Sequence, residues 1–466
     1  MRQDAFLGLD IGGTGAKAGV YDAGGRPLGF GHATYQPVPL PHGHVEIPIA
    51  DIERAARAAV RQAVRTSEAR VRALAISSQG ETFVSLDARG RPLHRAIVWY
   101  DARAQAEAKC LQRVMPDISA IAAAPKILWL RAHAPRIMAR ARRHLLLPDY
   151  FAWRLTGRAV TDPTTASSSG LYVDGETSYR SAALAAAGIP ADFLAEIQPA
   201  GTPIARLQGG AARAWSLPAD ARLVTGTNDQ YAGALGAGNS RPGILSVTTG
   251  TCLALVTLTR DPPRTVPPGL FVGGFPISPL FFLLAYAKTA GIVLDWFRRE
   301  FCPGRTWAEL ERAARAVPPG SRGICVCPHF DGRISPAPDP RVRGAISGLA
   351  LQHTAADIFR AMLESLCFVL RENVEFLEAT GAPLRAIRAI GGGAKSDLLL
   401  QMMADVLGRT VERPRVTEAA TLGAAMLAAF GAGRFPSLTA ASQTLYRGGR
   451  RFRPQGKVHR AYMQLN

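Results

Sequence analysis

The chain has 466 residues, of which 47% are hydrophobic and 20% are charged. This composition is typical of a globular protein, and the length favours two domains over a single core. The formal net charge of +19 comes mainly from arginines scattered among alanines, which indicates solvated helix faces and not a nucleic-acid-binding stripe. No apolar run is long enough for a membrane span and the N-terminus shows no secretion signal. We therefore expect a cytoplasmic protein without nucleic-acid or membrane partners.

The first elements form a strand-turn-strand, predicted at residues 5–10 and 16–22, with a third strand near 27–35. Glycines in the first turn allow backbone N–H groups to approach a phosphate closely. Thr14 adds a hydroxyl and Lys17 a positive charge, while Asp10 ends the strand, where a carboxylate can hold Mg²⁺. The turn therefore predicts triphosphate binding, although a tight hairpin without a ligand would show a similar pattern.

This turn differs from the two common nucleotide-binding patterns. A Walker loop requires G-x-x-x-x-G-K-[ST] followed by a helix, and a dinucleotide fingerprint also requires a helix after its glycines. Here a strand follows the glycines. A phosphate loop inside a β-hairpin is typical of the fold shared by actin, sugar kinases and Hsp70.

The rest of the first half alternates between predicted strands and helices. Its expected elements are a helix at 51–67, a strand at 71–77, a hairpin at 83–99, a helix from about 101, mostly helical structure over 120–160, a strand at 222–226 and a helix from 229.

The opening pattern partly recurs at residues 243–257, where Gly250 and Thr251 form the turn of a second predicted hairpin. Expected elements then follow at 355–380, 386–390, 396–408 and 418–431. This weak internal repeat predicts two duplicated α/β domains that face each other across a cleft. We place the first domain at 1–238, the second at 239–440 and an irregular tail at 441–466, with a Gly-rich hinge at 233–243.

Six cysteines are spread along the chain, and none has the spacing of a zinc site. Cys325 and Cys327 fall in one predicted strand, where their side chains would point to opposite faces. We interpret all six as reduced core thiols.

Several segments, taken in order, resemble the motifs of the FGGY carbohydrate kinase family over about residues 5–435. The most specific match is residues 344–364. The others are the Asp10 loop, 99–103, 155–162, 226–230, Gly250-Thr251, Gly291 with Trp296, 391–396 and 417–423. Two departures stand out. Gly13 replaces a threonine that the family loop usually carries, and Ala123 and Ala132 occupy polar positions of the motif around 126–130.

The resemblance implies two RNase H-like domains of mixed α/β structure, an ATP and Mg²⁺ requirement, and often a homodimer. Asp229 follows a strand and a Gly-Thr-Asn turn, so we expect it to be the base that accepts the substrate hydroxyl proton; its alternative role is a helix N-cap. Asp10 and Asp229 would hold Mg²⁺. The residues implied for nucleotide binding are Thr14, Lys17, Gly250, Thr251, Gly291, Gly392, Gly393, Lys395 and Ser396.

The expected sugar contacts lie in the first domain. Residues 78–82 contain Gln79, Gly80 and Glu81, where xylulose kinases usually carry Gln-Met-His-Gly and glycerol kinases carry Gln-Arg-Glu. The other expected contacts are Trp99, Asp101, Arg103, Asn228 and Gln230, although Trp99 equally fits a core position. The rest of the chain is most similar to xylulose kinases. D-Xylulose is therefore the first expected substrate, with glycerol, erythritol and L-ribulose as alternatives.

Two other functions compete with a sugar kinase of this family. A nucleotide-binding regulator on the same fold would be expected to lack Asp10 or Asp229, and both are present. A hexose kinase or repressor of the ROK type would carry an N-terminal helix-turn-helix or a His and Cys zinc cluster, and the sequence shows neither. Mg-ATP turnover over a sugar panel separates these functions.

Overall fold

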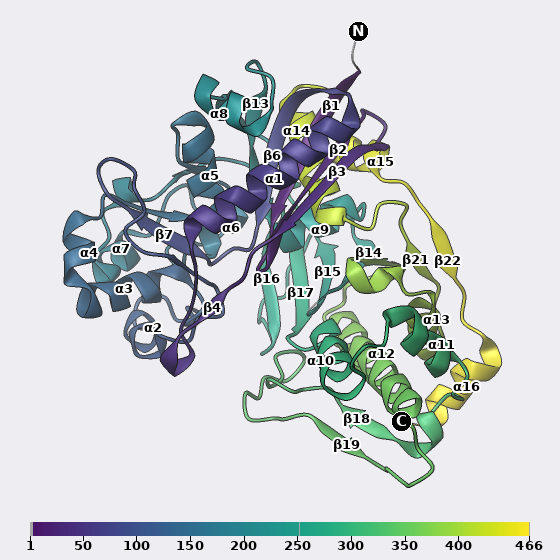
Figure 1. Cartoon of the computed structure of the whole chain (residues 1–466). Coiled ribbons are helices and arrows are strands. Elements are labelled where there is room, and N and C mark those ends of the chain that lie inside the picture. The colour runs from purple at the N-terminus through teal and green to yellow at the C-terminus, as the bar shows by residue number, and fades with distance from the viewer. Residues whose placement is uncertain (1–2, 251, 466) are drawn as a thin grey trace. The chain divides into compact units, whose positions relative to one another are not determined.

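The computed structural model describes residues 3–250 and 252–465, and its chain separates into two compact units (Figure 1). The first unit contains the residues up to Gly236, Gly274–Ser278 and Ala420–Leu445; the second contains Ala237–Gly273, Pro279–Ala419 and the residues from Tyr446 onward. The chain first leaves the first unit close to the expected boundary at 238. Residues 420–445, in contrast, belong to the first unit although the sequence placed nearly all of them in the second domain.

Most strands of the first unit lie in two sheets. One sheet has the order β12-β13-β6-β1-β2-β3, and the other has the order β4-β5-β8-β7-β9. The strands are β1 (Asp4–Ile11), β2 (Gly15–Tyr21), β3 (Pro27–Thr34), β4 (Val38–Pro39), β5 (Val45–Ile47), β6 (Arg70–Ser78), β7 (Phe83–Leu86), β8 (Ala96–Ile97), β9 (Arg143–Leu146), β12 (Pro203–Arg206) and β13 (Arg222–Asn228), with β10 (Val160–Thr161) and β11 (Glu196–Ile197) forming a separate pair.

The helices of the first unit surround these strands. They are α1 (Ile49–Ser67), α2 (Gln105–Leu111), α3 (Ala123–His133), α4 (Pro135–Arg140), α5 (Leu147–Thr156), α6 (Pro163–Ser167), α7 (Ser181–Ala187), α8 (Gly209–Trp215), α9 (Asp229–Gly236), α14 (Ala419–Gly431) and α15 (Leu438–Leu445).

The alternation of side chains along β1 assigns its two faces to different partners. Leu7 and Leu9 are fully buried in one core with Ile52 and Ala56 of α1. Gly8 points the other way, where a Cβ atom would lie 1.8 Å from the Thr421 carbonyl oxygen of α14. Glycine at this position therefore allows α14 to pack closely against the strand.

The second unit repeats the topology of the first. Its sheet has the order β16-β17-β15-β14-β20-β21-β22. As in the first unit, three antiparallel strands (β17, β15 and β14) are followed by two parallel ones (β20 and β21). These strands are β14 (Gly243–Thr249), β15 (Leu253–Thr259), β16 (Leu270–Gly274), β17 (Phe281–Ala287), β20 (Leu384–Ile390), β21 (Val411–Arg413) and β22 (Arg450–Phe452), and a separate pair comprises β18 (Cys325–Cys327) and β19 (Ala345–Ser347). The expected duplication of an RNase H-like α/β fold is confirmed.

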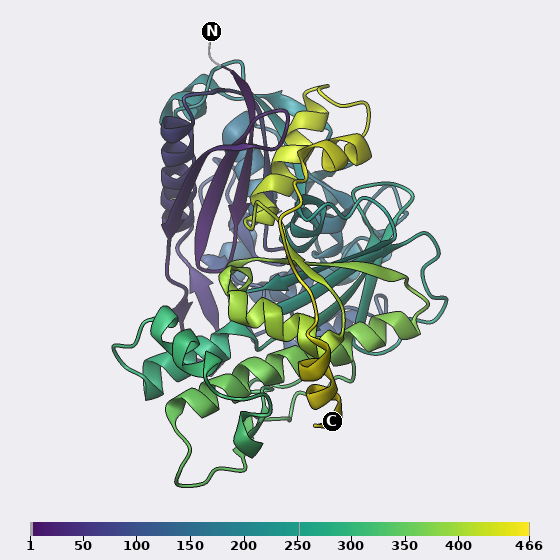
Figure 2. The ribbon, with the colours of Figure 1, turned by 90° about the vertical axis from the view of Figure 1, so that its right-hand side faces the viewer.

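Helices of the second unit pack on its sheet through one continuous core (Figure 2). Leu245 and Val247 of β14 share this core with Phe297, Phe359 and Leu400 from three different helices. The helices are α10 (Gly291–Phe301), α11 (Trp307–Arg315), α12 (Ala355–Ala379), α13 (Asp397–Leu407) and α16 (Gly456–Gln464). No described helix of the chain is apolar over a stretch long enough to cross a bilayer.

Two expectations about the chain are wrong. The tail is not irregular, because β22 pairs with β21 and α16 packs against α13. The fully buried Tyr462 of α16 donates a 2.9 Å hydrogen bond to Glu364. The cysteines are free, but only Cys302 and Cys367 are buried, whereas Cys110 and Cys325 are exposed.

Candidate functional site

Two acidic side chains of the first unit lie at the carboxyl ends of β1 and β13, the two strands that flank β6 in one sheet. Asp10 lies near the end of β1 and accepts a 2.9 Å hydrogen bond from the Ser77 hydroxyl of β6. Asp229 directly follows β13 and begins α9. Burial, together with the charges of Asp10 and Glu81, raises the pKa of Asp229 to about 7. With this pKa, the Asp229 carboxylate can accept a proton near neutral pH.

The turn between β1 and β2 is held from β3. The Tyr35 hydroxyl donates to the Gly12 carbonyl oxygen, and the Tyr35 backbone N–H donates to the Thr14 carbonyl oxygen at 3.0 Å. Thr14 itself is exposed, and Lys17 lies opposite Asp10 in the antiparallel register. Tyr35 thus fixes the turn on both sides of Gly13. In the sequence, Tyr35 is marked only by its position at the end of the third predicted strand, which gives no sign of this contact.

A buried lysine organises the neighbouring wall of the unit. Lys126 of α3 is fully buried, and its Nζ donates to the carbonyl oxygens of Val98, Trp99 and Ile121 at 2.8, 2.9 and 2.7 Å. Burial lowers the pKa of Lys126 to about 7, while the charge of Glu81 raises it. A neutral amine has only two N–H donors, so three carbonyl acceptors require the ammonium form.

Glu81 shares the surroundings of this ammonium group. Burial raises the pKa of Glu81, whereas the Lys126 charge and a hydrogen bond from Ser168 lower it. The adjacent Gly80 is enclosed, because a Cβ atom there would lie 2.3 Å from the Ser168 hydroxyl oxygen and 2.6 Å from the Asn228 amide nitrogen. A side chain at position 80 would therefore require Ser168 and Asn228 to move.

Two glutamines leave polar atoms unused inside the unit. Gln79 is 4% exposed, and within the described part of the chain neither its Oε1 nor its Nε2 has a hydrogen-bond partner. The Oε1 atom of Gln230 is likewise buried and unpaired among the described residues. Buried amide groups need hydrogen-bond partners, so these two side chains are suited to a ligand rich in hydroxyl groups.

A hydrogen-bond network holds the end of β13 where Asp229 begins. Asp162 caps α6 and accepts from the Thr164 hydroxyl at 2.6 Å. The Thr164 hydroxyl oxygen lies 2.7 Å from the Thr227 hydroxyl oxygen and accepts from the Asn228 backbone N–H at 3.3 Å. The motif around Asp162 thus supports, through Thr164, the strand end that precedes Asp229.

Asp101 and Arg103 are engaged with each other and with β5. The Asp101 carboxylate accepts from the Val45 backbone N–H and from the Arg103 guanidinium, at 2.7 Å from Nε. Arg103 also donates to Glu46 at 2.9 Å, and its side chain is only 3% exposed. Trp99 is partly exposed and packs edge-on against Tyr100. Of these three expected sugar contacts, Asp101 and Arg103 have their charged groups paired within the protein, and Trp99 is partly exposed.

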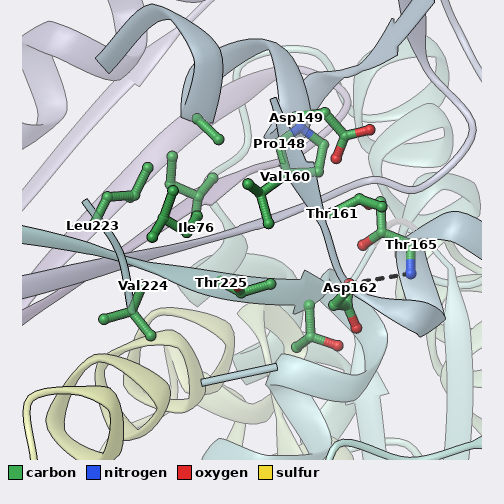
Figure 3. Close-up of a pocket in the computed structure, with 14 residues that line it drawn as sticks. Ile76, Pro148, Asp149, Val160, Thr161, Asp162, Thr165, Leu223, Val224 and Thr225 are labelled. Carbon is green, nitrogen blue, oxygen red and sulfur yellow. Dashed lines mark hydrogen bonds between the residues drawn. The ribbon is translucent and has the colours of Figure 1, made fainter. Parts of the chain in front are cut away.

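A small cavity lies against β6 and β13 of the six-stranded sheet (Figure 3). Apolar side chains of β6 and β13 line one side, while Asp149, Thr161 and Asp162 line another. The Asp149 carboxyl and the Thr161 hydroxyl are both buried. Burial raises the pKa of Asp149 well above its usual value; a hydrogen bond with Thr161 opposes this effect, and the charge of Asp162 adds to it.

We expect Asp149→Asn to make the protein more stable at neutral pH. When the pKa of a carboxyl group is higher in the folded than in the unfolded protein, its protonated form contributes fully to stability below about pH 4. This contribution is lost as the pH rises toward the folded-state pKa, at about 1.4 kcal/mol per pH unit. The difference in free energy of unfolding between variant and wild type should therefore grow between pH 5 and pH 8 in urea titrations. The exposed Asp192→Asn serves as the control. A difference that does not change with pH would contradict this account.

The glycine turns of the second unit are brought together. The Gly291 backbone N–H donates to the Gly250 carbonyl oxygen at 2.9 Å. Gly391 and Gly393 adjoin Thr249, because their Cβ positions would lie 3.2 and 3.0 Å from its atoms, whereas Gly392 faces open space. Thr251, an expected phosphate contact, lies outside the described residues.

Lys395 and Ser396 already have contacts of other kinds. Lys395 is paired with Glu418 at 3.6 Å, and its side chain is 68% exposed. The Ser396 hydroxyl caps α13 by accepting from the Leu399 backbone N–H at 3.1 Å. Ser396 therefore has a structural function in the described fold, and Lys395 carries an exposed charge at the edge of the glycine turns.

Comparisons with known proteins agree on one family. The model of the FGGY family of carbohydrate kinases, N-terminal domain, matches residues 5–236, and that of the C-terminal domain matches residues 245–432. A glycerol kinase of Bordetella parapertussis is 32% identical, with 93% of this chain and 90% of that protein covered. A xylulose kinase of Bacillus subtilis is 26% identical, with 98% and 94% covered.

Solved structures show the same fold. A ligand-bound xylulose kinase from Lactobacillus acidophilus superposes with a TM-score of 0.87 at 23% identity, covering 99% of this chain and 96% of that one. A Plasmodium falciparum glycerol kinase solved with ADP gives 0.84 at 21% identity, with 99% and 96% covered.

Proposed function

Because the chain belongs to the FGGY family of carbohydrate kinases, we propose that it transfers the γ-phosphoryl group of ATP to a terminal hydroxyl of a ketose or polyol. D-Xylulose is the first substrate we propose, and glycerol, erythritol and L-ribulose are the alternatives. The observation that carries the proposal is the pair Asp10 and Asp229, placed at the strand ends of one sheet beside unpaired amides.

Asp229 is the proposed general base. As the substrate oxygen bonds to the γ-phosphorus, the bond from that phosphorus to the bridging oxygen breaks, ADP leaves and the hydroxyl proton passes to the Asp229 carboxylate. A pKa near 7 suits this role, since the carboxylate is ionised at slightly alkaline pH and still basic enough to accept a proton. The hydrogen bonds through Thr164 and Thr227 hold the strand end from which Asp229 projects.

Asp10 and Asp229 fit a magnesium site. In kinases, Mg²⁺ is typically bound by one or two carboxylates together with phosphate oxygens of the substrate. The charge of Asp10 contributes to the raised pKa of Asp229, which indicates that the two carboxylates lie close together. The bound ion would neutralise charge on the phosphates. Thr14, Lys17 and the backbone of the turn held by Tyr35 would contact the same phosphates.

The glycine turns of the second unit are the proposed nucleotide-binding surface. Open space at Gly250 and Gly392 leaves the backbone accessible to a flat base or a phosphate. The ADP-containing glycerol kinase with the same fold supports a nucleotide as the ligand. We keep Gly291, Gly393 and Lys395 in this surface and propose Ser396 as its structural support.

Gln79, Glu81, Trp99, Asn228 and Gln230 are the proposed sugar contacts, with Gly80 shaping the wall. We leave Asp101 and Arg103 out, since their charged groups are engaged with each other, with Val45 and with Glu46. Gly80 differs from both the methionine of the xylulose kinase pattern and the arginine of the glycerol kinase pattern, so its enclosure by Ser168 and Asn228 does not separate the two substrates.

Release of ADP, measured in a coupled assay over D-xylulose, L-ribulose, erythritol, glycerol and gluconate, tests the proposal. We expect ATP-dependent turnover with a ketose, with kcat/KM at least about tenfold above that for glycerol, which corresponds to about 1.4 kcal/mol. Turnover with glycerol alone would overturn the choice of substrate. Absence of turnover with every compound would overturn the proposed function.

A further inference from the structure

The side chain of Gln79 lies at the β1–β2 turn. The residue follows β6 directly, and its backbone N–H donates to the Ile11 carbonyl oxygen at 3.1 Å. A Cβ atom on Gly13 would lie 3.7 Å from Gln79 Oε1, and no other heavy atom of the described residues, its chain neighbours aside, comes within 4 Å. The carboxamide therefore lies beside the position in this turn that carries no side chain.

The buried carboxamide of Gln79 needs hydrogen-bond partners that a ligand could supply. Gln79 is 4% exposed, and its two polar atoms have no partner among the residues the structure describes. Leaving such groups unpaired is unfavourable, because they lose their hydrogen bonds to water on burial and gain none in return. Rotation about the Cγ–Cδ bond exchanges oxygen and nitrogen, so the amide can present two N–H donors toward Gly13.

The charges around the turn favour a donor at this place. Asp10 of β1 and Asp229 after β13 stand at the ends of the two strands that flank β6, and Gln79 directly follows β6. A phosphoryl group in transfer is itself anionic and gains from a neutral hydrogen-bond donor.

We propose that Gln79 donates from Nε2 to a non-bridging oxygen of the phosphoryl group in transfer, in place of the hydroxyl that Gly13 lacks. This inference rests on the proposed kinase function and moves Gln79 from the sugar end of the site to the phosphate end. Its signature is an effect on kcat, because the contact is strongest when charge develops on the transferred group.

Four variants test the inference. Two are the single variants Gln79→Ala and Gln79→Glu, and two are double variants that combine Gln79→Ala with Gly13→Thr or with Gly13→Ala. We expect Gln79→Ala to lower kcat about 10²-fold with KM for the sugar within threefold of wild type. Gln79→Glu retains the shape but replaces the donor by an acceptor, and should lose at least as much. Gly13→Thr in the Gln79→Ala background should restore at least about tenfold, which is the return of one hydrogen bond of about 1.4 kcal/mol. Gly13→Ala, which adds a methyl group without a hydroxyl, should restore nothing.

A binding measurement separates the contact from turnover. ADP with aluminium fluoride, a mimic of the phosphoryl group in transfer, should raise the melting temperature of wild type above the value with ADP alone. Gln79→Ala should lose this additional shift and keep the shift with ADP. An increase in sugar KM at unchanged kcat, or rescue by Gly13→Ala equal to that by Gly13→Thr, would overturn the inference. Wild type that phosphorylates no sugar would instead overturn the proposed function.

Discussion

Asp229→Asn is expected to lower kcat by about 10³-fold or more while ATP binding is retained. The amide cannot accept the substrate proton, and general-base catalysis contributes about 10²–10⁴-fold. Because Asp229 begins α9 at a strand end held by Thr164 and Thr227, the substitution should leave the local backbone in place. Turnover by the ADP-release assay and nucleotide affinity by calorimetry give the two values.

The melting temperature distinguishes this loss from misfolding. Burial and the neighbouring charges of Asp10 and Glu81 raise the pKa of Asp229, so ionised Asp229 destabilises the fold at alkaline pH. A neutral amide removes this cost, and we expect the melting temperature of the variant at pH 8 to equal or exceed that of wild type. Asp192→Asn, the same change on the surface, should leave both quantities unchanged. Turnover of Asp229→Asn within tenfold of wild type would remove Asp229 from the role of base.

The sequence predicted the features that depend on local pattern. The meander of β1, β2 and β3, the helix over 51–67 and the second hairpin at β14 and β15 all appear near their expected positions. Asp10 and Asp229 were found because a polar residue at the end of an apolar strand has a recognisable signature. The order of family motifs then supplied the fold and the enzyme class.

Contacts between distant residues explain what the sequence did not reveal. Asp101 was expected to face a sugar hydroxyl, yet its carboxylate is turned toward Val45 and Arg103, and nothing in residues 99–103 encodes a partner over fifty positions away. The tail was expected to be irregular because its sequence is basic, whereas its apolar residues pack on α13 of the second unit. Lys126 was interpreted only as part of a partly matched motif.

Lys126→Met should destabilise the first unit by about 3–5 kcal/mol, because it removes a buried charge on which other buried groups depend. Three carbonyl oxygens, those of Val98, Trp99 and Ile121, would lose their donor. Glu81 would also lose the positive charge that opposes the effect of burial on its pKa. Urea denaturation monitored by circular dichroism measures the change.

A second substitution identifies the cause of this loss. Lys126→Met with Glu81→Gln should recover part of the stability, because the uncompensated carboxylate is gone while the three carbonyl oxygens stay unpaired. Lys109→Met, on the exposed side of α2, should change the free energy of unfolding by less than about 0.5 kcal/mol. If the double variant is no more stable than Lys126→Met, the loss comes from the carbonyl contacts alone. In that case Lys126 supports the Val98–Trp99 backbone, and the ionisation of Glu81 does not depend on it.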